Sequence, residues 1–422
     1  MKKILMMSLV VSSILMGSGY KIPETSTNSV ALSGANIAHT SSADAAYDNP
    51  ANMIFMDDKN QLEVDLMYIG LSATKFNGTV SSTGPYDLDS EKQTFIIPSV
   101  HYVSPKLGEN GVRVGLSIVV PGGLTRAWNE EPAKTVSEEF TLRIIEVNPT
   151  VAYKITNDLA IAFGFRLVHT SGVVKSSGTA NLTSSGLGVG IASRDMTGNS
   201  TDYGYNLALA YHPIENLEVA ATYRSKVALT VEGSADLSWN GLTIPATSST
   251  YSGDASVTVP LPATFSTALA YTFASKTTLE FVYEIAYWSA YENLDFDYDG
   301  TEGAVLGGIF GGKVAKNWRD TNTFRLGLTQ EFDSMTLMAG CVYDESPTPE
   351  KTLNFESPGS NSFAVSLGGR YRVNESIDVG LSALYSMKED RDVSGSVNIN
   401  GIDGTFTNSN ALLISDGLGY KF

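Results

Sequence analysis

The chain has 422 residues with 28 basic and 45 acidic side chains, giving a formal net charge of −17. Because phosphate binding needs a basic surface, this composition argues against nucleic acid as a partner. The one cysteine, Cys341, cannot form an internal disulfide and is expected to pack as a small apolar side chain.

The amino-terminal residues have the pattern of a secretory signal peptide. Two lysines precede an apolar stretch at 4–16, and a run of small residues at 17–19 suits a cleavage site. The apolar stretch is too short to cross a bilayer as a helix, and no run of 18 apolar residues follows it. We predict an exported protein whose signal peptide occupies residues 1–19.

After this segment, apolar and polar side chains alternate with a period of two, which is typical of strands with one apolar face. In 377–387, for example, Ile377, Val379 and Leu381 alternate with polar residues or glycine. Most alternating segments exceed the roughly 9–11 residues that a tilted strand needs to cross a bilayer. Fourteen strands are predicted, near 61–74, 92–104, 110–120, 139–153, 158–174, 201–213, 216–234, 255–273, 276–298, 318–331, 334–344, 361–373, 376–388 and 412–422.

The connections between these strands alternate between tight turns and long segments, as in outer-membrane barrels. We therefore predict an all-β fold, a 14-stranded antiparallel transmembrane β-barrel formed by residues 60–422 in the bacterial outer membrane. A water-soluble β-sandwich is the alternative. The long segments are expected near 75–91, 121–138, 175–200, 235–254, 299–317, 345–360 and 389–409.

The residues before the first strand are expected to form a plug inside the barrel. Fourteen strands enclose a lumen too wide for side chains alone to fill. Segment 20–59 contains small residues at 31–38 and a proline-interrupted run at 48–51, which suits a turn and not a central strand. We expect this segment to lie inside the barrel as a hatch.

Eight short motifs follow one another along most of the chain: GYKIPE (19–24), DNPA (48–51), IIPSVHYVSP (96–105), PGGL (121–124), PLP (260–262), YWSAY (287–291), NWRDT (317–321) and YDESPTP (343–349). By these motifs the chain resembles the FadL/TodX family of outer-membrane transporters for long-chain fatty acids and other hydrophobic compounds. That family has a 14-stranded barrel with an amino-terminal hatch, in agreement with the strand count.

The resemblance implies roles for two further segments. Asn49-Pro50-Ala51 would help to hold the hatch closed, and Tyr20 would reach into a binding pocket inside the barrel. An inward kink in the third strand would open a lateral gap, with Pro121-Gly122-Gly123 as the candidate residues. The alternative that Pro121 only ends this strand stays open.

An oily cargo requires exposed apolar surface for its capture. A long-chain fatty acid has about fifteen methylenes, each contributing roughly 0.8 kcal/mol on burial. Apolar side chains on loops often mark binding sites, although such loops can also pack on each other as a lid. The candidate capture residues are Leu187, Val189, Ile191, Leu237, Trp239, Leu242, Ile244, Val305, Leu306, Ile309 and Phe310.

A carboxylate headgroup entering an acidic protein would need local positive charge. If the apolar side of each strand faces lipid, both basic and acidic side chains face the lumen. The acidic ones are Glu218, Glu280, Glu284 and Asp378. Ion pairs that brace the hatch against the wall are therefore an alternative role for the lumenal cations. The headgroup candidates are Arg113, Arg166, Arg224, Lys226, Arg325, Arg370 and Arg372.

The predicted function is passive uptake of fatty acids or hydrocarbons, with hatch rearrangement and lateral exit through the barrel wall. A surface-exposed adhesin or receptor barrel with a closed lumen is the alternative. No enzyme activity, cofactor or metal is expected: the calcium-like run at 294–299 has Val305 where a bidentate glutamate is required. The expected partners are a hydrophobic ligand and outer-membrane lipid, and the expected state is a monomer.

Overall fold

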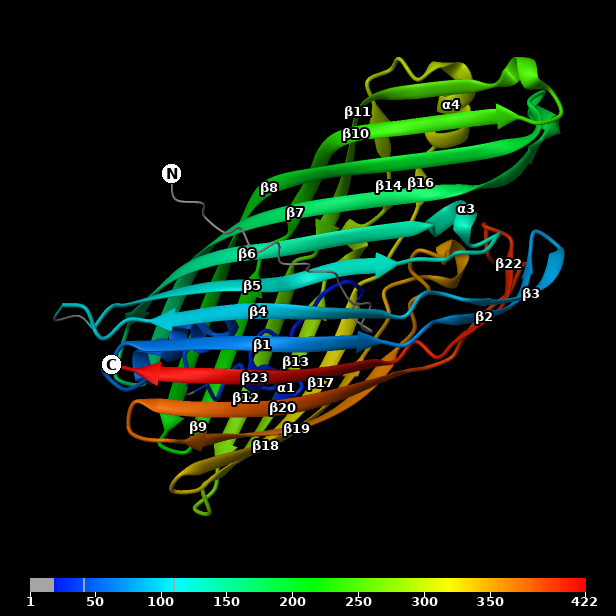
Figure 1. Cartoon of the computed structure of the whole chain (residues 1–422). Coiled ribbons are helices and arrows are strands. Elements are labelled where there is room, and N and C mark those ends of the chain that lie inside the picture. The colour runs from blue at the N-terminus through cyan, green and yellow to red at the C-terminus, as the bar shows by residue number, and fades with distance from the viewer. Residues whose placement is uncertain (1–18, 41, 109–110) are drawn as a thin grey trace.

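The computed structural model describes residues 19–40, 42–108 and 111–422, so the predicted signal peptide lies outside the described residues except for Gly19. Seventeen strands form one antiparallel sheet. Three of the barrel's long strands are interrupted, so that each appears as two of the seventeen: β9 with β10, β11 with β12, and β13 with β15. The barrel therefore has fourteen strands around its circumference. The sheet closes on itself where β1 pairs with β23, from Gln61 with Lys421 to Leu71 with Ala411 (Figure 1). The predicted 14-stranded barrel is confirmed.

The barrel strands are β1 (Gln61–Leu71), β4 (Gln93–Val103), β5 (Arg113–Arg126), β6 (Glu139–Lys154), β7 (Leu159–Leu182), β8 (Gly188–Ile214), β9 (Leu217–Arg224), β10 (Val227–Gly241), β11 (Ser249–Leu261), β12 (Thr264–Thr272), β13 (Thr277–Ala286), β15 (Phe296–Tyr298), β17 (Thr321–Glu331), β18 (Met335–Asp344), β19 (Ser362–Arg372), β20 (Ile377–Lys388) and β23 (Ala411–Lys421). Two small sheets lie outside this set. One joins β14 (Asn293–Leu294) to β16 (Val314–Ala315), and the other contains β2 (Lys75–Val80), β3 (Thr83–Asp89), β21 (Arg391–Val393) and β22 (Ile402–Thr407).

The helices are short. Three belong to the amino-terminal segment: α1 (Thr27–Ala31), α2 (Ala45–Asp48) and the 3-10 helix η1 (Pro50–Phe55). None of the helices in the described part of the chain is long and apolar enough to cross a membrane. The remaining helices are α3 (Lys134–Ser137), α4 (Gly303–Phe310), η2 (Thr183–Ser185), η3 (Pro245–Thr247), η4 (Trp288–Ala290) and η5 (Glu350–Thr352).

The alternation expected from the sequence sets the two faces of the wall. On β1, Val64, Leu66 and Tyr68 point outward and are 40–43% exposed, whereas Glu63 and Asp65, at alternate positions, are buried. An apolar outer face with a polar inner face is what a strand between lipid and a polar lumen requires. The chain is therefore built as an outer-membrane barrel.

Four strands are much longer than the sequence predicted. β7 continues to Leu182, β8 begins at Gly188, β10 continues to Gly241 and β11 begins at Ser249. The segments 175–200 and 235–254, expected as long loops, are therefore mostly strand. Together these strands form an extension that projects beyond the rest of the wall (Figure 1). The predicted strand 276–298 is interrupted: β13 ends at Ala286, the helix η4 follows, and the barrel sheet resumes at β15 (Phe296–Tyr298).

The break between β9 and β10 reverses which side chains face inward. Tyr223 on β9 is half-exposed, but on β10 Val227, Leu229 and Val231 have the same parity and are at most 5% exposed. Ser225 at the break donates its backbone N–H to the Tyr205 carbonyl at 2.9 Å. Lys226 is consequently exposed, and its predicted position in the lumen was wrong. In the extension, apolar side chains line the inside and polar ones face out.

The amino-terminal hatch lies inside the barrel, with short helices that contact many strands (Figure 1). The wall makes room for it with glycines: a Cβ atom on Gly340 would lie 2.3 Å from the carbonyl carbon of Leu32. On another side, Glu280 accepts hydrogen bonds from the backbone N–H groups of Ile37 and Ala38, both at 2.7 Å. Close backbone packing and wall carboxylates therefore fix the hatch.

The ion pairs expected between hatch and wall are present. His39 Nδ1 lies 2.9 Å from Glu218, and Lys21 Nζ lies 2.5 Å from Glu284. Burial opposes the charge on His39, but the hydrogen bond and charge of Glu218, with the charge of Glu280, raise the pKa of His39 from 6.5 to about 8. Docking of this part of the hatch therefore depends on pH.

A folded-state pKa above the unfolded value means that the His39 contribution is complete below pH 6.5 and is lost as pH rises through about 8. We expect His39→Gln to destabilise the detergent-solubilised protein by about 1–2 kcal/mol at pH 6, and by much less at pH 9. Thermal unfolding of both proteins at the two pH values measures this difference. Glu218→Gln serves as the matched variant and should show the same loss; an equal loss at both pH values would contradict the assignment.

Candidate functional site

The outer half of the lumen holds a large apolar cluster to which β6, β7, β8, β10 and β11 contribute. A narrow pocket lies within this cluster. We call this pocket the apolar chamber. It is lined by Phe140, Thr141, Leu142, Gly172, Val174, Met196, Thr197, Gly198, Val231, Gly233, Ala255, Val257, Val259 and Leu294. A lining of aliphatic side chains, glycines and two threonines suits an apolar ligand.

Tyr20 closes the inner end of the same cluster. Its ring centroid lies 4.7 Å from that of Trp288 and 5.9 Å from that of Trp318, and its hydroxyl donates a hydrogen bond to the Pro260 carbonyl. The contact with Trp288 is edge-to-face, an arrangement that aromatic pairs favour. The first residue of the predicted hatch is thus placed between the chamber and the lumen below.

The backbone around Tyr20 pairs with β5. Ile22 N–H donates to the Pro121 carbonyl at 2.9 Å, and Gly123 N–H donates to the Tyr20 carbonyl at 2.7 Å. The register between β5 and β6 shifts from Val119 to Gly122. β5 nevertheless continues to Arg126, so the alternative that Pro121 only ends the strand was wrong. Proline and glycines here produce an inward bulge on which the amino-terminal segment docks.

Beside this bulge, the wall opens between β4 and β5. β4 pairs with β1 along its whole length, but among the described residues its ladder with β5 has four pairs, from Val100 with Ile118 to Val103 with Gly115. Beyond the opening the chains meet again, where Glu91 N–H donates to the Ala127 carbonyl at 2.9 Å. We call the unpaired stretch between these two points the window.

Apolar side chains fill the inner side of the window. Phe95 and Ile97 of β4 belong to one buried cluster with Val120 of β5 and Ile22 of the hatch. At the outer rim, Arg126 donates hydrogen bonds to the hydroxyls of Thr74 at 2.7 Å and Ser90 at 3.1 Å. The window is therefore a break in backbone pairing that is sealed by side chains, part of them from the hatch.

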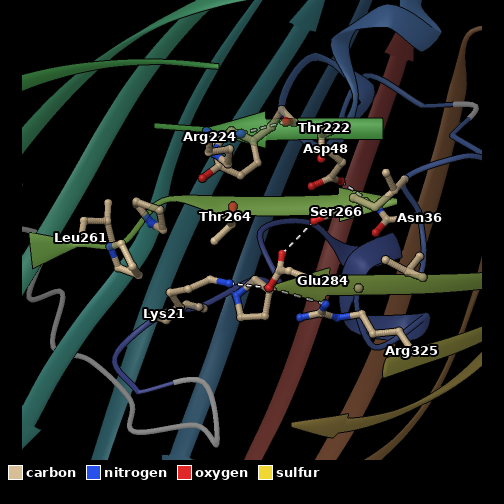
Figure 2. A pocket seen from close by; sticks show the side chains of 18 of the residues that line it. Lys21, Asn36, Asp48, Thr222, Arg224, Leu261, Thr264, Ser266, Glu284 and Arg325 are labelled. Atoms are coloured by element: carbon tan, nitrogen blue, oxygen red, sulfur yellow. Dashed lines mark hydrogen bonds and ion pairs between the residues drawn. The ribbon is translucent and has the colours of Figure 1, made fainter. Parts of the chain in front are cut away.

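A second cavity lies between the hatch and β9, β12, β13 and β17, and Pro121 is part of its lining. Figure 2 shows Lys21, Glu284 and Arg325 together on one side of it, where Glu284 lies 2.5 Å from Lys21 Nζ and 3.8 Å from Arg325 Nη1. Asp48, bonded to Asn36 at 2.7 Å, lies elsewhere in the lining. Unlike the apolar chamber, this lower cavity has charged side chains in its lining.

The predicted headgroup residues are mostly engaged with protein partners. Arg166 and Arg224 share the buried carboxylate of Glu146, at 2.8 and 2.6 Å. Arg370 is bound to Glu63 and, at 2.6 Å, to Asp378.

The two remaining candidates lie near the ends of their strands. Arg113 donates to the carbonyls of Met56 and Asp57 at the end of the hatch, at 2.6 and 2.8 Å. Arg372 is exposed and donates to the Asp333 carbonyl at 3.3 Å. Neither residue lines the apolar chamber.

The predicted capture residues separate into two groups. Leu237, Trp239 and Leu306 are buried in the apolar cluster, and Leu187, Val305, Ile309 and Phe310 pack against it. Ile191, Leu242 and Ile244 are 40–54% exposed on the extension, and Val189 is half-buried beside them. Residues from three separate predicted loops therefore do gather around the chamber and at its outer end.

The predicted hatch motif lies where α2 meets η1. The Asn49 side chain accepts the Ala51 N–H at 3.1 Å and donates to the Ile37 carbonyl at 2.8 Å and the Leu209 carbonyl of β8 at 3.3 Å. Pro50 occupies the first turn of η1, where its missing N–H costs nothing. The motif connects two hatch segments with the wall.

Reasoning from the sequence missed Arg194, which lies on β8 within a stretch expected to be a loop. Its guanidinium carbon lies 4.3 Å from the Phe296 ring centroid. It also missed Trp288 and Trp318 as contacts of Tyr20, although both belong to motifs that carried the family resemblance. The extended strands, which only the structure reveals, bring Arg194 to the chamber.

Known proteins share this architecture. The chain is 24% identical over 411 residues to the long-chain fatty acid transport protein of Escherichia coli (strain K12), covering 89% of this chain and 90% of that protein. A Pseudomonas aeruginosa FadL homologue has a similar fold, with a TM-score of 0.83 at 19% identity and coverage of 96% of this chain and 100% of that chain. For the P. putida toluene transporter TodX, the TM-score is 0.71 at 18% identity, with 94% and 98% covered.

The family model for outer membrane transport proteins matches residues 8–422. It therefore covers the hatch, the bulge, the window and the chamber as well as the rest of the wall. This protein belongs to the outer membrane protein transport protein family (OMPP1/FadL/TodX).

Proposed function

We propose that this outer-membrane protein takes up hydrophobic small molecules through the apolar chamber and releases them sideways through the window between β4 and β5. The observation that carries this proposal is the position of Tyr20 and Ile22. One side of this short segment closes the chamber, and the other pairs with the bulge of β5 at the window. A shift of the segment would open both at once.

Capture begins at the extension. Exposed apolar residues at its tip lead to side chains that are buried around the chamber. Burial of about fifteen methylenes favours the chamber over water by on the order of 12 kcal/mol. Long-chain fatty acids and hydrocarbons both fit this description, and the names of the relatives include carriers of each.

Release requires the affinity to fall. A ligand held by that much apolar contact would stay bound unless the chamber changed shape, so we infer that the hatch moves. Asn49-Pro50-Ala51 would control this movement, because Asn49 connects the hatch with β8. Sideways exit through the window would deliver the ligand to the membrane interior without carrying its chain past the charged side chains of the lower cavity.

The adhesin or receptor alternative predicts a lumen that stays closed. The bulge, the docked amino-terminal segment and the apolar chamber would have no role in such a protein. A closed ring of strands within a single chain leaves no unpaired sheet edge at β1 or β23, which supports the proposed monomer.

A disulfide between hatch and wall tests whether the hatch must move. The hydroxyl oxygens of Ser33 in the hatch and Ser366 on β19 lie 2.7 Å apart, so Ser33→Cys with Ser366→Cys, in a Cys341→Ser background, should form a bond. We expect oxidation to leave ligand binding intact and to lower uptake into cells at least tenfold, with recovery after reduction.

The matched control is Ser193→Cys with Ser238→Cys. These hydroxyl oxygens are also 2.7 Å apart but join β8 to β10 in the extension, so uptake should not change on oxidation. If the hatch disulfide forms and uptake is normal, the proposed hatch movement is wrong.

Gly122 tests the coupling between hatch and bulge. A Cβ atom there would lie 2.7 Å from the Tyr20 carbonyl oxygen, so Gly122→Ala should displace the amino-terminal segment. We expect a change in the fluorescence of Trp288 and Trp318 and faster dissociation of a bound fatty acid by about tenfold. Gly312→Ala is the control, because a Cβ atom there would meet no other atom within 4 Å. Equal behaviour of both variants would contradict the coupling.

A further inference from the structure

Arg194 lies at the outer end of the apolar chamber. Along β8, Arg194, Met196 and Gly198 share one face, and the latter two line the chamber. The Arg194 guanidinium carbon is 4.3 Å from the Phe296 ring centroid and 5.9 Å from that of Phe310 on α4. The guanidinium charge of Arg194 therefore lies against aromatic rings. Arg194 is the next residue on this face of β8 after Met196, which lines the chamber.

No acidic side chain neutralises this arginine directly. Among residues 19–40, 42–108 and 111–422, no carboxylate oxygen lies within 4.0 Å of its guanidinium. Asp195, its neighbour in sequence, pairs with Lys175 at 3.5 Å. Glu356, whose charge also reaches Arg194, is itself bound to Lys316. The hydroxyl of nearby Tyr298 donates to Met196 Sδ at 3.9 Å.

This situation differs from that of the lumenal arginines that pair with carboxylates of the wall. Arg166 and Arg224 contact Glu146, and Arg370 contacts Glu63 and Asp378. Among the described residues the Nε atom of Arg194 is buried without a hydrogen-bond partner, as is that of Arg224. A guanidinium has five N–H donors in a planar fork that matches the two oxygens of a carboxylate. Arg194 thus has donors left for an anionic group.

We propose that Arg194 receives the carboxylate of a long-chain amphiphilic acid at the outer mouth of the chamber, while the acyl tail occupies the space lined by Met196, Val231 and Leu294. This inference rests on the proposed uptake function and narrows its substrate class. A neutral hydrocarbon gains nothing from the guanidinium, so Arg194 favours acids over neutral molecules of equal length. The stacked rings hold the guanidinium in place before the ligand arrives.

A purely structural role would make the guanidinium a brace between Phe296 and Phe310. The two roles differ in their dependence on ligand charge. Arg194→Met keeps an unbranched stem that can cover the rings and removes the charge. Arg194→Lys keeps the charge and loses the planar fork. Lys175→Met is the matched control, because Lys175 is a cation on the neighbouring strand that pairs with Asp195.

The test uses the full-length mature protein in nanodiscs of zwitterionic lipid, with palmitate and hexadecanol as probes of equal chain length. We expect Arg194→Met to weaken palmitate binding about tenfold, as for loss of a charge-assisted hydrogen bond, and to leave hexadecanol binding unchanged. Arg194→Lys should recover part of the loss. Raising the salt concentration should weaken palmitate binding to the wild type and to Lys175→Met, but not to Arg194→Met.

Two results would overturn the proposal: unchanged palmitate binding in Arg194→Met, or an equal loss for palmitate and hexadecanol, which would assign Arg194 to packing alone. Failure of the wild type to bind either probe would instead contradict the proposed uptake function. The comparison therefore separates an error about the headgroup from an error about transport.

Discussion

Two backbone hydrogen bonds connect the hatch to the wall at the point where the wall opens. They join Ile22 to Pro121 and Gly123 to Tyr20. A strand that leaves its neighbour within the hydrocarbon layer exposes N–H and C=O groups, each at a cost of several kcal/mol. The amino-terminal segment supplies partners for β5 where β4 no longer does. The window is therefore stable only with the segment docked, which couples the state of the wall to the position of the hatch.

The reversal of parity after Ser225 gives one sheet two kinds of interior. Below the break, strands face lipid with apolar side chains and the lumen with polar ones. Above it, Val227, Leu229 and Val231 point inward, and the extension faces outward with polar residues. An apolar chamber can then exist above a lower cavity with charged side chains without a change in the composition of the strands. The break at Ser225 and Lys226 achieves this because it shifts the alternation by one residue, and in a pattern with a period of two such a shift moves every later side chain to the other face.

Charges in the lumen serve mainly to position the hatch. Glu218, Glu280 and Glu284 each bind a hatch residue, and Arg113 holds its end through backbone carbonyls. Buried ion pairs often contribute little net stability, because desolvation offsets their attraction. They penalise misplacement strongly, however, since a separated partner leaves an unpaired buried charge. Such contacts suit a plug that must occupy one defined position and still be able to leave it.

The sequence by itself determined the strands that cross the membrane, their number, the tight turns and the family, because alternation and turn residues are local properties of the chain. Segments such as 175–200, rich in serine and glycine with weak alternation, gave no strand signal, and Arg194 was therefore not considered for the lumen. Only the tertiary structure decided that Lys226 faces outward, that β4 and β5 separate, and that Tyr20 docks on β5. Each of these depends on pairing between residues far apart in the chain, and hydrogen bonds between distant backbones leave no periodic pattern in the sequence.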